Sequence, residues 1–360
     1  MTARIDELLV YLHERGGSDL HLAAGLEPRV RISGALQPVS GWGVLGAEEL
    51  EAMMREIASD GHWDHYQATL DADFAYGVPA VARFRVNFFY QENGPGAVMR
   101  IIPEKILTLE DLEVPAAVAE LAHRERGLIL VTGPTGSGKS TTLAAIIGAI
   151  NAGYDKHIVT IEDPIEFVHE PKRCLITQRE VGEHTRSFAS ALRAAIRQNP
   201  DVILVGEMRD HETIALALTA AEMGMLVFGT LHTNSAVKTI DRLIDAFPSD
   251  EQDQARIALS ESLEAVCAQL LLPVAGGARN GRGRVAVHEI LLRTSALPNI
   301  IREGNTGMLA SMIQNGKRRG MQTMDDALWR LLDQGVIHPE DAYRKAQDKR
   351  RFEPRLPAGA

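Results

Sequence analysis

The chain has 360 residues, a formal net charge of −10, and 5% aromatic residues. This length predicts two domains, and the acidic balance and scarce aromatics argue against a general nucleic-acid-binding protein. Two distant cysteines indicate neither a disulfide framework nor a zinc site, and they suit a reducing cytoplasm. The acidic start does not predict a signal peptide, and no run approaches the roughly 20 apolar residues of a membrane span. If the protein works at a membrane, we expect it to act at the membrane surface without spanning the bilayer.

The first hundred residues predict a small α+β domain, residues 1–103. Apolar residues at helical spacing predict a first helix over 2–15, with Ile5, Leu8, Leu9 and Leu12 on one side. Further helices are expected near 47–58 and 62–69, and strands within 18–25, 28–36, 71–78, 81–91 and 96–102. Alternation over 82–88 puts Arg83, Arg85 and Asn87 on one face of a strand. A polar, acidic linker over 104–125 follows.

From residue 126 onward, apolar runs alternate with helical patterns. Such near-continuous runs separated by helices are typical of a parallel sheet buried on both faces, so the fold class is α/β. The four runs are 127–133, 157–163, 201–207 and 226–233. After residue 249 the chain is interpreted as helical, including the apolar stretch 257–272, and one more strand is expected at 285–292. This domain is placed at 126–296, and 297–360 is interpreted as a region of short helices.

The strongest local signal is a glycine-rich loop between a predicted strand and a predicted helix. It matches G-x-x-x-x-G-K-[ST], the P-loop motif, in the context that the motif requires. Such a loop turns backbone N–H groups toward phosphate oxygens at a helix N-terminus. Lys139 is expected to reach the β and γ phosphates of ATP, and Ser140 to hold Mg²⁺. The predicted nucleotide-binding residues are Gly133, Pro134, Thr135, Gly136, Ser137, Gly138, Lys139, Ser140 and Thr141.

Two later strands of the predicted sheet end in carboxylates. Glu162, Asp163 and, after a proline, Glu166 follow one of them, and Glu207 follows the other. Ligands collect at the carboxyl ends of parallel strands, so both groups are placed to meet the phosphates. Hydrolysis needs a carboxylate that orients water. We take Glu162 and Asp163, with Ser140, as candidate metal ligands. Alternatively, Asp163 and Asp210 are helix N-terminal caps.

These motifs together resemble the secretion-type ATPase superfamily, and within it the retraction ATPases of type IV pili. The resemblance covers nearly the whole chain and rests on "GPTGSGKST", "TIEDPIEFVHE", "LRAAIRQNPDVILVGEMRD", "FGTLHTNSAVKTIDR", "SDLHLAAGLEPRVRISGAL" and "GMQTMDDAL". It implies a RecA-like P-loop NTPase domain, a smaller PAS-like N-terminal domain, and ATP bound between the two. It also implies a homohexameric ring in the cytoplasm, at the inner-membrane face of the pilus machine. The implied partners are an inner-membrane platform protein and related pilus ATPases, with no nucleic acid.

The resemblance also assigns roles to single residues. It implies that Glu207 is the general base toward the attacking water and that Glu166 is a second catalytic acid. His232 is expected near the γ-phosphate, as a sensor linked to domain movement. The resemblance further implies that arginines of the N-terminal domain reach the nucleotide, and the matching positions are Arg83, Arg85 and Arg100. The alternative for these arginines is a solvated β edge.

One segment departs from the family pattern, and more than one function stays open. Retraction ATPases carry a motif like AIRNLIRE, whereas residues 297–303 read LPNIIRE, so only the second half is retained. An accessory retraction ATPase shares most of the motifs. A nucleotide-gated regulatory subunit with little turnover is a further possibility, and so is a RecA-like nucleic-acid motor. Extension and secretion ATPases carry a four-cysteine metal motif, which two cysteines cannot build.

Overall fold

The structure is a computed structural model that describes residues 3–32, 34–102, 105–277, 279 and 283–357. The chain divides into two compact units: Met1–Lys105 with Pro164–Val168, and Ile106–Asp163 with His169–Ala360. The domain boundary predicted at 103/104 falls outside the described residues, so the predicted limits of the domains stay predictions.

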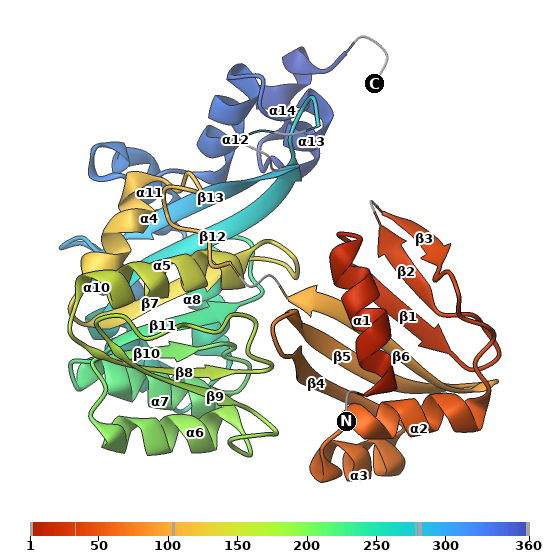
Figure 1. Cartoon of the computed structure of the whole chain (residues 1–360). Helices are drawn as coiled ribbons and strands as arrows, with labels where there is room; N and C mark the ends of the chain where they lie inside the picture. Colours follow the sequence, from red (N-terminus) through yellow and green to blue (C-terminus); the bar gives the residue numbers. More distant parts are fainter. Residues whose placement is uncertain (1–2, 33, 103–104, 278, 280–282, 358–360) are drawn as a thin grey trace. The chain divides into compact units, whose positions relative to one another are not determined.

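Among its described residues, the first unit contains one antiparallel sheet and the helices α1, α2 and α3 (Figure 1). The strands lie in the order β3-β2-β1-β6-β5-β4. The stretch 28–36, expected as one strand, instead contributes to two strands, β2 and β3, which pair antiparallel. The elements are α1 (Arg4–Glu14), β1 (Asp19–Ala23), β2 (Arg29–Ile32), β3 (Ala35–Pro38), α2 (Ala47–Ile57), α3 (Asp60–Thr69), β4 (Asp71–Val78), β5 (Ala82–Gln91) and β6 (Gly94–Ile102).

The core of this unit lies on one face of the sheet. The four apolar residues predicted to line one side of α1 are all fully buried. They join alternate residues of the strands, such as Phe84, Val86 and Phe88 of β5, in one apolar cluster. The residues between them in β5 face the other way, so Arg83, Arg85 and Asn87 lie on the face opposite this core.

The second unit contains a seven-stranded sheet and most of the helices of the chain (Figure 1). Its elements are α4 (Ala116–Ala119), β7 (Gly127–Thr132), α5 (Lys139–Gly153), β8 (His157–Glu162), β9 (Leu175–Glu180), α6 (Phe188–Ala195), β10 (Val202–Val205), α7 (His211–Glu222), β11 (Leu226–Leu231), α8 (Ala236–Asp245), α9 (Gln252–Ser262), β12 (Leu263–Pro273), β13 (Arg284–Leu292), α10 (Leu297–Arg302), α11 (Met308–Asn315), α12 (Met324–Asp333), α13 (Pro339–Lys345) and α14 (Lys349–Phe352).

The strand order of this sheet is β13-β12-β7-β11-β10-β8-β9, and all strands except the edge strand β13 run parallel. Every residue of β7, β10 and β11 is buried, so both faces of the sheet are covered. This confirms the expected α/β class. Strand β11 lies between β7 and β10. The chain segments that follow these three strands therefore lie side by side, at the carboxyl ends of the strands.

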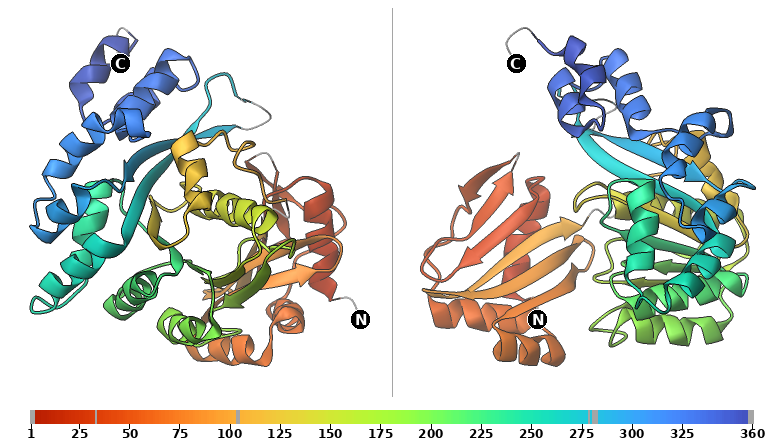
Figure 2. Two further views of the ribbon diagram at one scale, coloured as in Figure 1. Left: turned by 90° about the vertical axis from the view of Figure 1, so that its left-hand side faces the viewer. Right: turned by 180° about the vertical axis from the view of Figure 1, so that it is seen from behind.

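The stretch 257–272 is expected from the sequence to be helical, and this expectation is wrong for residues 263–272. Helix α9 ends at Ser262, and Leu263–Pro273 form β12, beside β7. Strands β12 and β13 extend beyond the rest of the sheet to α12–α14, where they share a separate apolar cluster with these helices (Figures 1 and 2). Strand β9 was not expected either. The short helices expected after residue 297 are present.

Among the described residues, none of the helices combines the length and the apolar composition that a bilayer crossing requires.

Candidate active site

The phosphate-binding motif forms the turn from β7 into α5. Gly133, Gly136 and Gly138 all have a positive φ, at 149°, 76° and 88°. Side chains are strained in this conformation, so the turn depends on glycine. A Cβ on Gly133 would also lie 2.2 Å from the backbone oxygen of Gln269, a residue of β12. The loop is therefore packed closely against β12 at Gly133, where there is no room for a side chain.

The side chains of the loop fit a phosphate group. Lys139 Nζ donates to the carbonyl oxygens of Gly133, at 2.8 Å, and Pro134, at 3.3 Å, so the ammonium lies over the loop. Ser137 is 3% exposed, and its Oγ has no hydrogen-bond partner among the described residues. A buried hydroxyl without a partner is costly unless a ligand satisfies it. The α5 N-terminus, with Ser140 and Thr141 half-buried, adds backbone donors and a favourable dipole.

The loop that follows β10 is tied to β11 by three contacts. Thr230 Oγ1 donates to the carbonyl of Gly206 at 2.5 Å, and the Met208 amide donates to the carbonyl of Thr230 at 3.0 Å. The Met208 side chain packs over Gly229, where a Cβ would lie 2.3 Å from its sulfur. These contacts hold Glu207, which lies between Gly206 and Met208, at the end of β11.

Glu207 is bound by two neighbouring side chains. His232 Nε2 lies 2.8 Å from Glu207 Oε1, and Arg209 contacts both oxygens, with Nε 2.5 Å from Oε1 and Nη2 2.6 Å from Oε2. The Glu207 side chain is 18% exposed. Burial raises its pKa, but the hydrogen bond and charge of Arg209, aided by His232, outweigh this effect and lower the pKa overall. Glu207 is therefore a carboxylate at neutral pH.

His232 brings this carboxylate beside the phosphate loop. Leu231, the last residue of β11, is paired with Thr132, the last residue of β7, and the Gly133 amide donates to the Leu231 carbonyl at 3.2 Å. His232 thus follows the residue that the loop contacts. The structure brings together the predicted residues Glu207 and His232, and their catalytic roles stay predictions.

The other predicted acids lie in different settings. Glu162 Oε1 accepts hydrogen bonds from Thr160, at 2.6 Å, and from Gln178, at 3.2 Å. Asp163 is exposed, and Glu166 is half-buried in the segment that groups with the first unit. Asp210 accepts a hydrogen bond from the Thr213 amide at the start of α7, so it is a helix cap, as the alternative interpretation had it.

Within the described part of the chain, no three His, Cys, Asp or Glu side chains form a group able to hold a metal ion. Mg²⁺ is usually held by one or two protein oxygens together with water and substrate phosphates. The loop, with Ser140 in the first turn of α5, fits that mode of binding better than a cage of acids. The assignment of Ser140, Glu162 and Asp163 as ligands stays a prediction.

The predicted arginines all belong to the first unit. Arg85 on β5 lies directly opposite Arg100 on β6, an arrangement of like charges that is unfavourable by itself. Arg100 Nε donates to Asp19 Oδ1 at 2.7 Å. Arg85 is exposed and Arg83 is half-buried. Whether these arginines act on the nucleotide stays a prediction.

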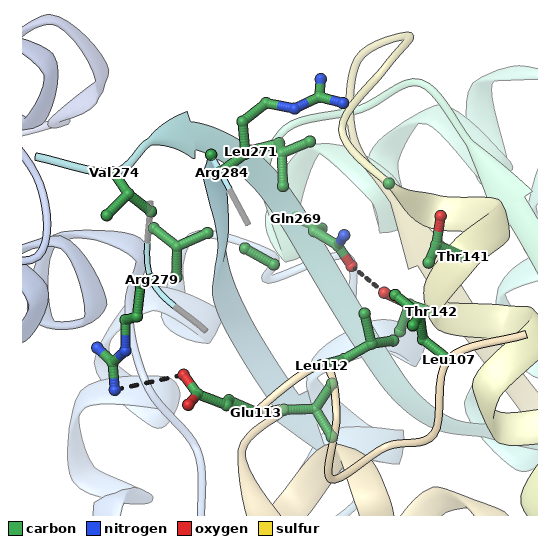
Figure 3. A pocket seen from close by; sticks show the side chains of 15 residues that line it. Leu107, Leu112, Glu113, Thr141, Thr142, Gln269, Leu271, Val274, Arg279 and Arg284 are labelled. Carbon is green, nitrogen blue, oxygen red and sulfur yellow. Dashed lines mark hydrogen bonds and ion pairs between the residues drawn. The ribbon is translucent and has the colours of Figure 1, made fainter. Parts of the chain in front are cut away.

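Two residues of the second unit were not assigned a role from the sequence. One is Arg209, the ion-pair partner of Glu207. The other is Gln269, which is 1% exposed and lies against the phosphate loop. It lines a cavity of about 280 Å³ beside α5, together with linker and β12–β13 residues such as Leu112 and Leu271 (Figure 3). The sequence did carry a signal for Gln269: it is the lone amide in the apolar run 265–272, and a buried side-chain amide needs hydrogen-bond partners.

Comparison with known proteins places the chain among secretion and pilus proteins. The profile of the family described as type II/IV secretion system protein matches residues 5–342. The type IV pilus retraction ATPase PilT of Pseudomonas aeruginosa is 50% identical over 97% of this chain and 99% of its own length. A twitching motility protein of Neisseria gonorrhoeae is 52% identical over 89% of this chain and 84% of its own.

A solved structure supports the same relationship. The crystal structure of the pilus retraction motor PilT with bound ADP superposes with a TM-score of 0.89. It covers 98% of this chain and 100% of its own, at 46% sequence identity.

Proposed function

The chain belongs to the type II/IV secretion system protein family, and we propose that it is an ATPase that powers retraction of a type IV pilus, and hence twitching motility. The observation that carries the proposal is the carboxylate of Glu207, held by Arg209 and His232 next to a phosphate-binding loop. The relatives named above, a retraction ATPase and a twitching motility protein, support the specific cellular role.

Binding is proposed to begin with the triphosphate in the loop 133–140. The backbone amides of the loop and Lys139 hold the phosphate oxygens, and Ser137 Oγ gains a partner there. The cavity beside α5 is proposed to take the nucleoside, because its walls are apolar next to a few polar groups. Mg²⁺, with Ser140 as a ligand, would neutralise charge on the phosphates.

Glu207 is proposed to orient the attacking water. Its lowered pKa keeps it ionised, so it accepts a hydrogen bond from water but is a weak base. Orientation suffices, because catalysis of phosphoryl transfer is mainly positioning and charge stabilisation. His232 contacts Glu207 and directly follows Leu231, which pairs with Thr132 at the end of β7, and so can relay phosphate contacts to β11.

The remaining roles are proposed from the resemblance. Arg85 and Arg100, with Arg83, are proposed to stabilise charge on the transferred phosphate, and Glu166 to act as a second acid. We propose that the chain works as a homohexamer in the cytoplasm, at the inner-membrane face of the pilus machine. There it would contact a platform protein and related pilus ATPases, and each turnover would drive a domain rotation.

The first test is phosphate release by the purified full-length chain with ATP and Mg²⁺. We expect turnover in the wild type and its loss in Lys139→Ala. A wild type that binds ATP without turnover would favour a nucleotide-gated regulatory subunit. Stimulation by added DNA or RNA would favour a nucleic-acid motor, and an unchanged rate would count against one.

The second test is deletion of the gene in its host, with twitching and surface pili scored. Loss of twitching with excess pili supports retraction, and loss of pili altogether points to extension. The alternative with related motifs is an accessory retraction ATPase. A deletion strain that still retracts its pili, with reduced efficiency, would favour that role.

A further inference from the structure

The side-chain amide of Gln269 joins the phosphate loop to the first turn of α5. Its Nε2 donates to the carbonyl oxygen of Ser137 at 2.7 Å, and its Oε1 accepts from Thr142 Oγ1 at 2.9 Å. Gln269 is 1% exposed and Thr142 is 2% exposed, so water does not compete for these groups. Figure 3 shows the second of these hydrogen bonds at the edge of the cavity.

The hydrogen bond to Ser137 fixes the direction of one peptide group. A trans peptide is planar, so the carbonyl of Ser137 and the N–H of Gly138 point in opposite directions. Because Gln269 holds that carbonyl toward β12, the Gly138 N–H is directed away from β12. The opposite orientation would present a carbonyl oxygen to the phosphates, which would repel them.

This peptide needs a partner that holds it. Gly138 has a φ of 88°. Because glycine has no side chain, its backbone can adopt more conformations than that of any other residue type. The loop also lies directly on Gln269: a Cβ on Gly138 would be 2.9 Å from Gln269 Nε2, and one on Gly133 would be 2.2 Å from the Gln269 backbone oxygen. Strand β12 is thus the support on which the loop rests.

We propose that Gln269 is a positioning residue of the nucleotide site, which aims the Gly138 amide at the phosphate bound by the loop. The inference rests on the proposed function, because it assumes that the loop binds the phosphates of a nucleotide. Gln269 acts through the peptide 137–138 and touches no reacting atom.

The test uses purified full-length protein, with dissociation constants measured for ADP and for adenosine by competition against a fluorescent ADP. In Gln269→Leu the peptide loses its buried partner, so ADP affinity is expected to fall about tenfold or more, which corresponds to about 1.4 kcal/mol or more. Adenosine affinity is expected to fall less than ADP affinity, because adenosine meets Gln269 only at the wall of the cavity and does not use the loop amides.

Three further variants separate positioning from general damage. Thr142→Val removes only the contact to Oε1, so a smaller loss is expected. Cys267→Ala truncates a buried residue two positions earlier on β12 and should leave ADP affinity unchanged. Gln269→Glu keeps the hydrogen bond to Thr142, but it places a carboxylate oxygen, which cannot donate, next to the Ser137 carbonyl oxygen. Burial raises the pKa of a carboxyl at this position, so lowering the pH from 8.5 to 6 should protonate it, and the ADP affinity should recover because the protonated carboxyl can donate.

The outcomes are distinct. A folded Gln269→Leu that binds ADP within twofold of the wild type, or that loses ADP and adenosine equally, overturns the inference. If Gln269→Leu does not fold, the pH dependence of Gln269→Glu decides. The inference is overturned if ADP affinity changes with pH in Gln269→Glu no more than it does in the wild type. A wild type that binds no ADP overturns the proposed function as well, whereas normal wild-type binding with an unaffected variant overturns the inference alone.

Discussion

His288 on β13 leads to a prediction about stability and pH. The residue is 2% exposed, and its Nε2 has no hydrogen-bond partner among the described residues. Burial lowers the pKa of His288 to about 4. In the unfolded chain its pKa is near 6.5, so below that pH the unfolded state takes up a proton that the folded state resists. The folded pKa is depressed, and the folded state therefore loses stability as the pH falls from about 6.5 toward 4.

The magnitude follows from these two pKa values. At pH 8 neither state binds the proton and the contribution of His288 is zero. At pH 5 the unfolded state is favoured by about 2 kcal/mol, and at pH 4 by about 3 kcal/mol. Burial also lowers the pKa of His169 to about 4, so the acid sensitivity of the wild type is correspondingly larger.

The assay is urea unfolding of the wild type and of His288→Leu at pH 8 and pH 5, under conditions where unfolding is reversible. Leucine fills a similar volume and does not titrate. From pH 8 to pH 5, the free energy of unfolding of the wild type should fall by about 2 kcal/mol more than that of the variant, because His169 contributes equally to both proteins. If the two proteins lose the same free energy, His288 titrates in the folded state as it does in the unfolded chain, and the reasoning is refuted.

Two further predictions concern Glu289 and Gly133. Glu289 accepts from the amides of Ala236, at 2.8 Å, and Met324, at 3.3 Å, so Glu289→Ala should destabilise the chain by about 2–5 kcal/mol in urea unfolding. Glu289→Gln keeps one acceptor oxygen and should lose less stability than Glu289→Ala. Equal losses of stability in the two variants would contradict the account. Gly133→Ala should weaken ADP binding at least about tenfold, because its Cβ would lie 2.2 Å from a backbone oxygen. Gly153→Ala, whose Cβ would meet no described atom within 4 Å, is the control and should bind normally.

The sequence was sufficient where local pattern and global fold agree. The glycine loop was identified because a fully apolar strand precedes it and a helix follows, and the structure has β7 and α5 there. The ends of β10 and β11 were expected at the same edge of the sheet, and Glu207 and His232 are indeed in contact. The amphipathic pattern of α1 also predicted its buried side.

The sequence was insufficient where partners lie far apart along the chain. Leu263–Leu272 is nearly all apolar, and such a run fits a buried helix as well as a buried strand. Its identity as β12 follows from pairing with β7, more than 130 residues earlier in the chain. Gln269 could not be assigned a role for the same reason, since Ser137 is its partner across 132 positions. Arg209 was visible beside Glu207, but its two contacts to the carboxylate depend on how the loop after β10 turns.

The most direct test of the central claim is Glu207→Gln in the purified chain, with ATP affinity and phosphate release measured together. If Glu207 orients the attacking water, ATP should bind within a few-fold of the wild type while turnover falls by about 10²–10⁴. Near-normal turnover in this variant would contradict the account, because the carboxylate held by Arg209 and His232 would then not take part in hydrolysis.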